Sequence, residues 1–125
     1  MPLSETHYPD SYYYHSANQI KDRPSLYEDI KTDVCIIGAG YTGLLSAINL
    51  AEKGYKVVVL EANRVGWGAS GRNGGQVGSG HNKKIHLLER DYGKSLANDL
   101  WNLSEEAKSI VQERIRVHDI DCDLK

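Results

Sequence analysis

Blocks of apolar and polar positions along the chain predict two short strands with a helix between them. Residues 33–37 (DVCII) and 56–60 (KVVVL) are apolar after their first residue, as is typical of strands buried in a parallel sheet. Residues 42–53 carry apolar side chains at helical spacing, at Leu44, Leu45, Ala47, Ile48 and Ala51. This order predicts an α/β fold: a partial doubly wound (Rossmann-like) βαβ unit, with a buried helix lying against the strands and further helices after it.

The C-terminal third is predicted to be helical. A short helix is expected over Lys83–Tyr92 with Gly93 as its stop, and a longer one near Lys94–His118. A weak capping sequence at Ser104 favours a break within the longer helix. The apolar stripe of the longer helix predicts a core face, and a coiled-coil dimer is the more specific alternative. The stripe comprises Leu96, Leu100, Leu103, Ala107, Ile110 and Val117, with Arg114 on the same stripe.

We expect three segments in one small domain: an arm over residues 1–31, the βαβ unit and its loops over 32–80, and a helical segment over 81–125. The arm is rich in tyrosine, at Tyr8, Tyr12, Tyr13, Tyr14 and Tyr27. Aromatic side chains gathered in this way indicate docking, either on another surface or on this chain's own helices, and we favour the second.

A glycine-rich turn connects the first strand to the helix and points to a ligand. Residues 38–43 read GAGYTG, a G-x-G-x-x-G loop that opens directly onto a helix. Gly38 suits the tight turn, Gly40 lets the backbone approach a pyrophosphate, and Gly43 lets the helix pack on the strands. The helix N-terminus attracts phosphate. The sequence therefore predicts a site for an adenine dinucleotide.

The acid that ends the second strand narrows the choice of dinucleotide. Glu61 follows Gly43 by 18 residues, near the spacing of about 20 at which an acid binds the ribose hydroxyls. A carboxylate at this position accepts hydrogen bonds from a ribose diol and repels a 2′-phosphate. NADP is therefore disfavoured, while FAD and NAD remain.

A glycine- and arginine-rich run follows over residues 64–76 (RVGWGASGRNGGQ), with five glycines and two arginines. It offers many backbone N–H groups to an oxygen-rich ligand, and Arg64 and Arg72 can offset phosphate charge. A solvated surface loop without function is the alternative. The length of the run favours a functional loop.

These residues resemble a known family. From about Tyr8 to Leu124 the chain is similar to FAD-dependent oxidoreductases of the D-amino-acid oxidase and glycine oxidase superfamily, in particular the gamma-glutamylputrescine oxidase group. The likeness rests on YPDSYY at residues 8–13, the GAGYTG loop, VVVLEANRVGWGASGRNGGQ at 57–76 and IDCD at 120–123. It implies FAD contacts at Gly38, Gly40, Tyr41, Thr42, Gly43, Glu61, Ala62, Arg64, Ala69, Ser70, Gly71, Arg72, Asn73, Gly74, Gly75 and Gln76.

The resemblance also implies an activity. The family oxidises the C–N bond of an amine or amino acid by hydride transfer to the flavin, and oxygen reoxidises the flavin. Its members are several times longer and have a separate substrate domain, so we expect this chain to be an N-terminal part that is inactive alone. No catalytic base is visible in the sequence. A catalytically inactive, truncated dinucleotide-binding module is the alternative, and a small NAD-dependent module is a weaker one.

Charge and composition limit the remaining classes. Lys and Arg number 15 against 17 Asp and Glu, and no basic run favours nucleic acid. No apolar segment approaches the roughly 18 residues of a membrane span, and the first residues lack signal-peptide character, so we expect a cytoplasmic protein. The expected partners are a small-molecule amine, bound through the further domain, and a complementary chain.

Cysteine and histidine add no candidate chemistry. Cys35 is expected to be a buried, inert thiol in the first strand. Cys122 lies between two aspartates, which disfavour a reactive thiolate. No metal site is expected, and the histidines (His7, His15, His81, His86 and His118) are interpreted as surface residues.

Overall fold

The computed structural model describes residue 8, residues 10–18, residue 21 and residues 23–125. The chain forms two units, Met1–Gly74 and Gly75–Lys125, which are described separately. Part of the predicted arm, including His7, lies outside the described residues. None of the described helices combines the length and the apolarity that crossing a membrane requires.

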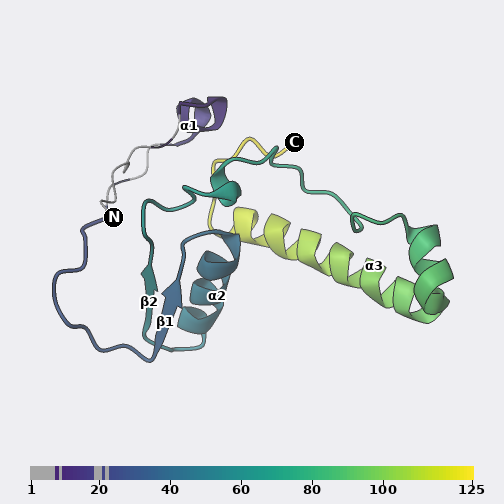
Figure 1. The fold of residues 1–125 in the computed structure, drawn as a ribbon, viewed down its shortest axis with the longest axis horizontal. Helices are drawn as coiled ribbons and strands as arrows, with labels where there is room; N and C mark the ends of the chain where they lie inside the picture. Colours follow the sequence, from purple (N-terminus) through teal and green to yellow (C-terminus); the bar gives the residue numbers. More distant parts are fainter. Residues whose placement is uncertain (1–7, 9, 19–20, 22) are drawn as a thin grey trace. The chain divides into compact units, whose positions relative to one another are not determined.

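The first unit contains the expected βαβ unit (Figure 1). Strands β1 (Val34–Ile37) and β2 (Val57–Leu60) pair in parallel, with Val34 opposite Val57 and Ile37 opposite Leu60. Helix α2 (Tyr41–Glu52) connects them and packs on both strands. The two strands and the helix are therefore confirmed, each within a residue of its expected bounds.

Hydrogen bonds at its two ends fix the register of this small sheet. At the start, the Thr32 hydroxyl donates to the Lys56 carbonyl over 2.5 Å, and the Lys56 N–H donates to the Asp33 carboxylate over 2.8 Å. At the other end, the Gly38 N–H donates to the Leu60 carbonyl over 2.7 Å. The ladder thus continues one residue past β1, and the chain turns toward α2 only after Gly38.

Burial in this unit is shallower than expected. No residue of α2 is buried, and Ile37 is 82% exposed at the end of β1. The interpretation of Cys35 as a buried thiol is wrong, because its side chain is exposed. Residues along β1 alternate between partly buried and exposed, since one helix covers only one face of a two-stranded sheet.

The described part of the arm contains a short helix, α1 (Tyr12–Ser16). Ser11 caps it, because its hydroxyl accepts a hydrogen bond from the Tyr14 N–H over 3.3 Å. The expectation that the tyrosines pack on the chain's own helices is wrong for four of them: the exposed fractions are 78% for Tyr12, 42% for Tyr13, 50% for Tyr14 and 91% for Tyr27.

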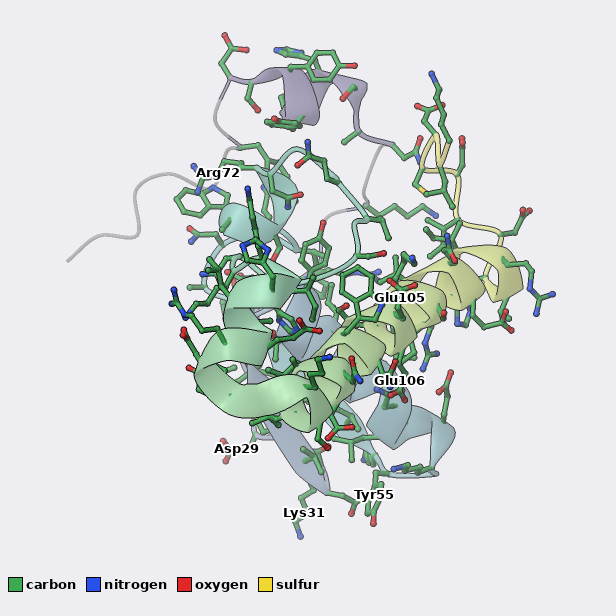
Figure 2. All side chains as sticks on the ribbon, turned by 90° about the vertical axis from the view of Figure 1, so that its right-hand side faces the viewer. Asp29, Lys31, Tyr55, Arg72, Glu105 and Glu106 are labelled. Atoms are coloured by element: carbon green, nitrogen blue, oxygen red, sulfur yellow. The ribbon has the colours of Figure 1, made fainter. Side chains whose placement is uncertain are left out.

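The second unit is built around helix α3 (Ile85–Val117), which bends at Gly93. Gly93 has φ 81° and ψ 160°, outside helical geometry, so the predicted boundary between two helical segments is confirmed. The predicted break at Ser104 is wrong, because the helix runs through it. Ser104 is buried, and its hydroxyl accepts the Gly80 N–H over 2.9 Å. Glu105 and Glu106, which follow it, both extend from α3 (Figure 2).

The apolar stripe expected as the core face of this helix is exposed. The exposed fractions are 47% at Leu96, 58% at Leu103, 46% at Ile110 and 57% at Val117. The buried positions of α3 are instead Leu88, Ala97 and Ser104. The inward face is displaced from the stripe because the loop at Gly80 and His81 packs beside it; His81 Nε2 lies 2.8 Å from the Leu100 carbonyl oxygen. The four described histidines are exposed, as expected.

Candidate dinucleotide-binding site

The turn between β1 and α2 presents backbone N–H groups at the start of the helix. Gly38 has φ +99°, a left-handed conformation that glycine adopts without strain. Gly40 caps α2 without any side-chain hydrogen bond. The N–H groups of Thr42 and Gly43 lie in the first turn, where an α-helix has no internal acceptor for them. The turn is therefore suited to an anionic group.

Two glycines of the turn lie where a side chain has no room. A Cβ on Gly43 would lie 2.0 Å from the Gly38 carbonyl oxygen and 3.4 Å from Ile36 Cγ2 on β1. A Cβ on Gly40 would lie 2.8 Å from Ser70 Oγ. Gly43 thus allows close packing between helix and strand, and Gly40 allows close approach between the turn and the later loop.

Glu61 binds the turn from the end of β2. One carboxylate oxygen accepts the Ala39 N–H over 2.7 Å, and the other accepts the Asn63 N–H over 3.0 Å. The Ala39 bond, followed by the Asn63 bond, holds the pKa of the Glu61 carboxyl below its ordinary value, although burial acts in the opposite direction. The carboxylate is therefore charged at neutral pH. An ionised carboxylate has about four acceptor sites, so Glu61 can accept a ligand hydroxyl as well as these backbone N–H groups.

The glycine- and arginine-rich run folds back on the turn. The Gly66 N–H donates to the Ala39 carbonyl over 2.9 Å, and the Tyr41 N–H donates to Ser70 Oγ over 3.0 Å. A Cβ on Gly71 would lie 2.2 Å from the Gly66 carbonyl oxygen, so this loop also crosses itself closely. Contacts between residues far apart in the sequence distinguish it from a plain solvated loop.

Side chains in the second half of the run support its shape. A short 3₁₀ helix, η1 (Ala69–Gly71), is followed by Arg72, which is labelled in Figure 2. The Arg72 guanidinium lies 4.7 Å from the centre of the Trp67 ring. The Asn73 amide donates to the carbonyls of Ala69 and Ser70 over 3.1 Å and 2.9 Å, and to the Tyr41 hydroxyl over 3.3 Å. The run is therefore an ordered turn, although all of its glycines except Gly66 are exposed.

The structure brings together several predicted site residues. Glu61 contacts the glycine turn, while Tyr41 contacts both Ser70 and Asn73. Arg64 lies beside Tyr8, with its Cζ atom 6.0 Å from the ring centre. The remaining predicted residues of this unit belong to the same segments: Gly38, Gly40, Thr42, Gly43, Ala62, Ala69, Gly71, Arg72 and Gly74. Gly75 and Gln76 belong to the second unit, so this site is described without them.

Ala39 is the residue that the sequence reasoning passed over. It is 2% exposed, its N–H binds Glu61 and its carbonyl binds Gly66. It therefore connects the acid to the later loop. Its place between the first two glycines of the motif, where only a small side chain fits, is the feature of the sequence from which this role could have been predicted.

Together these features fit a dinucleotide cofactor. The turn has glycine where a Cβ would collide, the helix starts with N–H groups suited to a phosphate, and a charged carboxylate stands at the end of the neighbouring strand. The fold and the site together define a dinucleotide-binding βαβ domain. Its carboxylate favours a cofactor whose ribose hydroxyls are free.

Comparison with known proteins identifies the family within this class. Residues 33–125 match the family described as DAO: FAD dependent oxidoreductase. Because the match covers most of the chain, the chain belongs to this family. FAD is its expected cofactor, which confirms the expectation from the sequence.

Three curated relatives show the extent of the likeness. Gamma-glutamylputrescine oxidoreductase of Escherichia coli (strain K12) is 48% identical over 120 residues, 96% of this chain and 28% of that protein. Probable oxidoreductase OrdL of Haemophilus influenzae is 49% identical over 115 residues, 92% of this chain and 27% of that protein. Putative Rieske 2Fe-2S iron-sulfur protein YhfW of Bacillus subtilis (strain 168) is 30% identical over 111 residues, 89% of this chain and 22% of that protein.

The chain thus spans about a quarter of the length of the curated relatives it matches. No solved structure matches it.

Proposed function

We propose that this chain is the FAD-binding part of a flavin-dependent oxidoreductase that oxidises the C–N bond of an amine or amino acid. The observation that carries the proposal is the junction of three segments at Ala39. Its N–H binds Glu61 and its carbonyl binds Gly66, so the acid, the glycine turn and the later loop form one surface. Membership of a family of FAD-dependent oxidoreductases indicates that the cofactor is FAD.

Each part of this surface has a proposed role. The N–H groups at the start of α2 donate to the pyrophosphate, and Gly40 leaves the space that the phosphate needs. Glu61 accepts from the ribose hydroxyls. The arginines Arg64 and Arg72 offset phosphate charge, and residues 69–74 line the cofactor toward its flavin end.

The name of one relative supports the amine chemistry. The Escherichia coli relative is named as an oxidoreductase of gamma-glutamylputrescine, an amine. Bound FAD would accept the hydride from the carbon that carries the nitrogen, and we propose oxygen as the final acceptor. We place the groups that hold the amine outside these 125 residues, because the chain spans about a quarter of that relative. Within this chain, the proposed task of the residues is to bind and orient the cofactor.

An inactive binding module that associates with a complementary chain is the second candidate. It is favoured by the shallow core: among the described residues, the buried hydrophobic side chains are Ala39, Leu88 and Ala97, and no large side chain is fully buried. Amine-dependent peroxide formation separates the two candidates. It should be absent from this chain alone and should appear when the complementary part of the enzyme is added. A pair that binds FAD but never oxidises an amine would favour the module.

Cofactor selectivity tests the binding function. The purified chain is titrated with FAD, NAD and NADP, and binding is followed by quenching of flavin fluorescence and by calorimetry. We expect saturable binding of FAD and the weakest binding of NADP, because its 2′-phosphate would face the Glu61 carboxylate. A folded chain that prefers NADP, or that binds no FAD, would contradict the proposal.

A further inference from the structure

Tyr8 of the N-terminal arm contacts the segment that follows β2. Its hydroxyl donates to the Val65 carbonyl over 2.5 Å, although 57 positions separate the two residues. Its ring stacks on Tyr14 with the centres 5.4 Å apart, and Arg64 lies beside its face. Tyr8 is partly buried, whereas the other described tyrosines of the arm are exposed. Tyr8 is less exposed than the other tyrosines because it contacts the glycine- and arginine-rich run.

The peptide group that Tyr8 holds also holds the glycine turn. The Val65 carbonyl and the Gly66 N–H belong to one peptide plane, and that N–H donates to the Ala39 carbonyl over 2.9 Å. The N–H of the same residue, Ala39, belongs to the preceding peptide group and donates to Glu61 over 2.7 Å. A donor on a carbonyl strengthens the N–H of the same peptide as a donor, since linked hydrogen bonds polarise one another. The Tyr8 hydroxyl therefore strengthens the bond that ties the later loop to Ala39, the residue that also binds the proposed ribose-binding acid.

We propose that Tyr8 is a positioning residue for the dinucleotide site. Its hydroxyl fixes the Val65–Gly66 peptide, and this peptide fixes the glycine turn against the later loop. Its ring holds the Arg64 guanidinium on the same side, where a cation beside an aromatic face is attracted to it. The inference rests on the proposed FAD-binding function and assigns the arm a part in it: to order the site before the cofactor arrives.

The test compares Tyr8→Phe, which removes only the hydroxyl, with Tyr8→Ala, which also removes the ring. Tyr27→Phe is the matched control, because Tyr27 lies on the same arm and is 91% exposed. Two quantities are measured on the full chain: the Kd for FAD, and the amide exchange rate of Gly66 with and without FAD. The exchange rate of the Ala97 amide in α3 reports any general loosening.

The inference predicts a Kd raised about two- to tenfold in Tyr8→Phe, the effect of one net hydrogen bond, and raised further in Tyr8→Ala. Gly66 exchange should quicken in Tyr8→Phe even without FAD, while Ala97 exchange stays unchanged. By linkage, FAD should slow Gly66 exchange less in this variant than in wild type. Tyr27→Phe should match wild type in every measurement.

Two results would overturn the inference, and they are distinguishable. If wild type binds FAD and Tyr8→Phe matches it in Kd and in Gly66 exchange, Tyr8 has no positioning role and the proposed function stands. If Gly66 and Ala97 exchange quicken together, the effect is general loosening and the inference also fails. If wild type itself binds no FAD, the proposed function fails, and the inference with it.

Discussion

Gly43→Ala tests the close contact between α2 and the end of β1. The added Cβ would lie 2.0 Å from the Gly38 carbonyl oxygen, and real Cβ atoms essentially never come within 3.0 Å of a neighbour. The helix and the turn must therefore separate by about 1 Å. Because the atom in the way is backbone, no side-chain rotation relieves the overlap. Overpacking of this kind costs about 1–3 kcal/mol.

A second effect has the opposite sign. Alanine is a better helix former than glycine by roughly 1 kcal/mol in a helix interior, and less at the first turn, where Gly43 lies. The overlap is the larger effect, so we expect Gly43→Ala to lower the free energy of unfolding by about 1–2 kcal/mol. We also expect it to weaken FAD binding, because Gly38 and the turn move with it.

The assay is urea denaturation followed by circular dichroism, paired with the FAD titration. Gly78→Ala is the control, because a Cβ there meets nothing within 4 Å. It should stay within about 0.5 kcal/mol of wild type. If Gly43→Ala were as stable as Gly78→Ala and bound FAD equally well, the close packing assigned to Gly43 would be refuted.

Two further predictions concern single hydrogen-bonding groups. Because the pKa of Glu61 is lowered from 4.5, its contribution to the free energy of unfolding is complete above that pH and is lost as the pH falls through the lower pKa of the folded state. Acid denaturation of Glu61→Gln should therefore lack this part of the pH dependence. Parallel curves of unfolding free energy against pH for wild type and variant would contradict the prediction. Ser104→Ala removes the acceptor of the Gly80 N–H. It should lower the free energy of unfolding by about 1–2 kcal/mol and speed the exchange of the Gly80 amide. Ser109→Ala is the control, because its exposed hydroxyl donates within α3, and it should leave the exchange of that amide unchanged.

The parts of the fold that the sequence predicts well depend on neighbouring residues. The runs at 34–37 and 57–60 pair as strands, and the glycine motif between the first strand and α2 forms the turn that its spacing requires. Gly93 divides the C-terminal helix, as its conformational freedom suggests. In each case the preference of a short segment and the contacts of the folded chain agree.

Predictions that depended on which surfaces meet were wrong. The sequence predicts Cys35 as a core residue because its neighbours are apolar, yet its side chain is exposed, and none of the described elements buries it. The stripe through Leu103 reads as a core face, yet the loop at Gly80 packs on the neighbouring face through Ser104. Periodicity predicts that a helix has an apolar side; it carries no information about which side another segment covers.

The candidate site divides in the same way. The G-x-G-x-x-G motif and Glu61 are predicted from spacing alone, because their proposed roles follow from backbone geometry. The hydrogen bond from Tyr8 to Val65 joins residues 57 positions apart and leaves no local pattern. The role of Ala39 was likewise hidden, since its contribution comes from its backbone and its burial.

The visible absorption spectrum of the purified chain, before and after addition of FAD, tests the central claim most directly. Gly40→Val is the matched variant, because a Cβ added at Gly40 would lie 2.8 Å from Ser70 Oγ. The valine methyl groups would also fill the space proposed for the pyrophosphate. We predict a bound-flavin spectrum for wild type and only free flavin for Gly40→Val. A bound spectrum in both, or in neither while the chain is folded, would contradict the assignment of this turn as the FAD site.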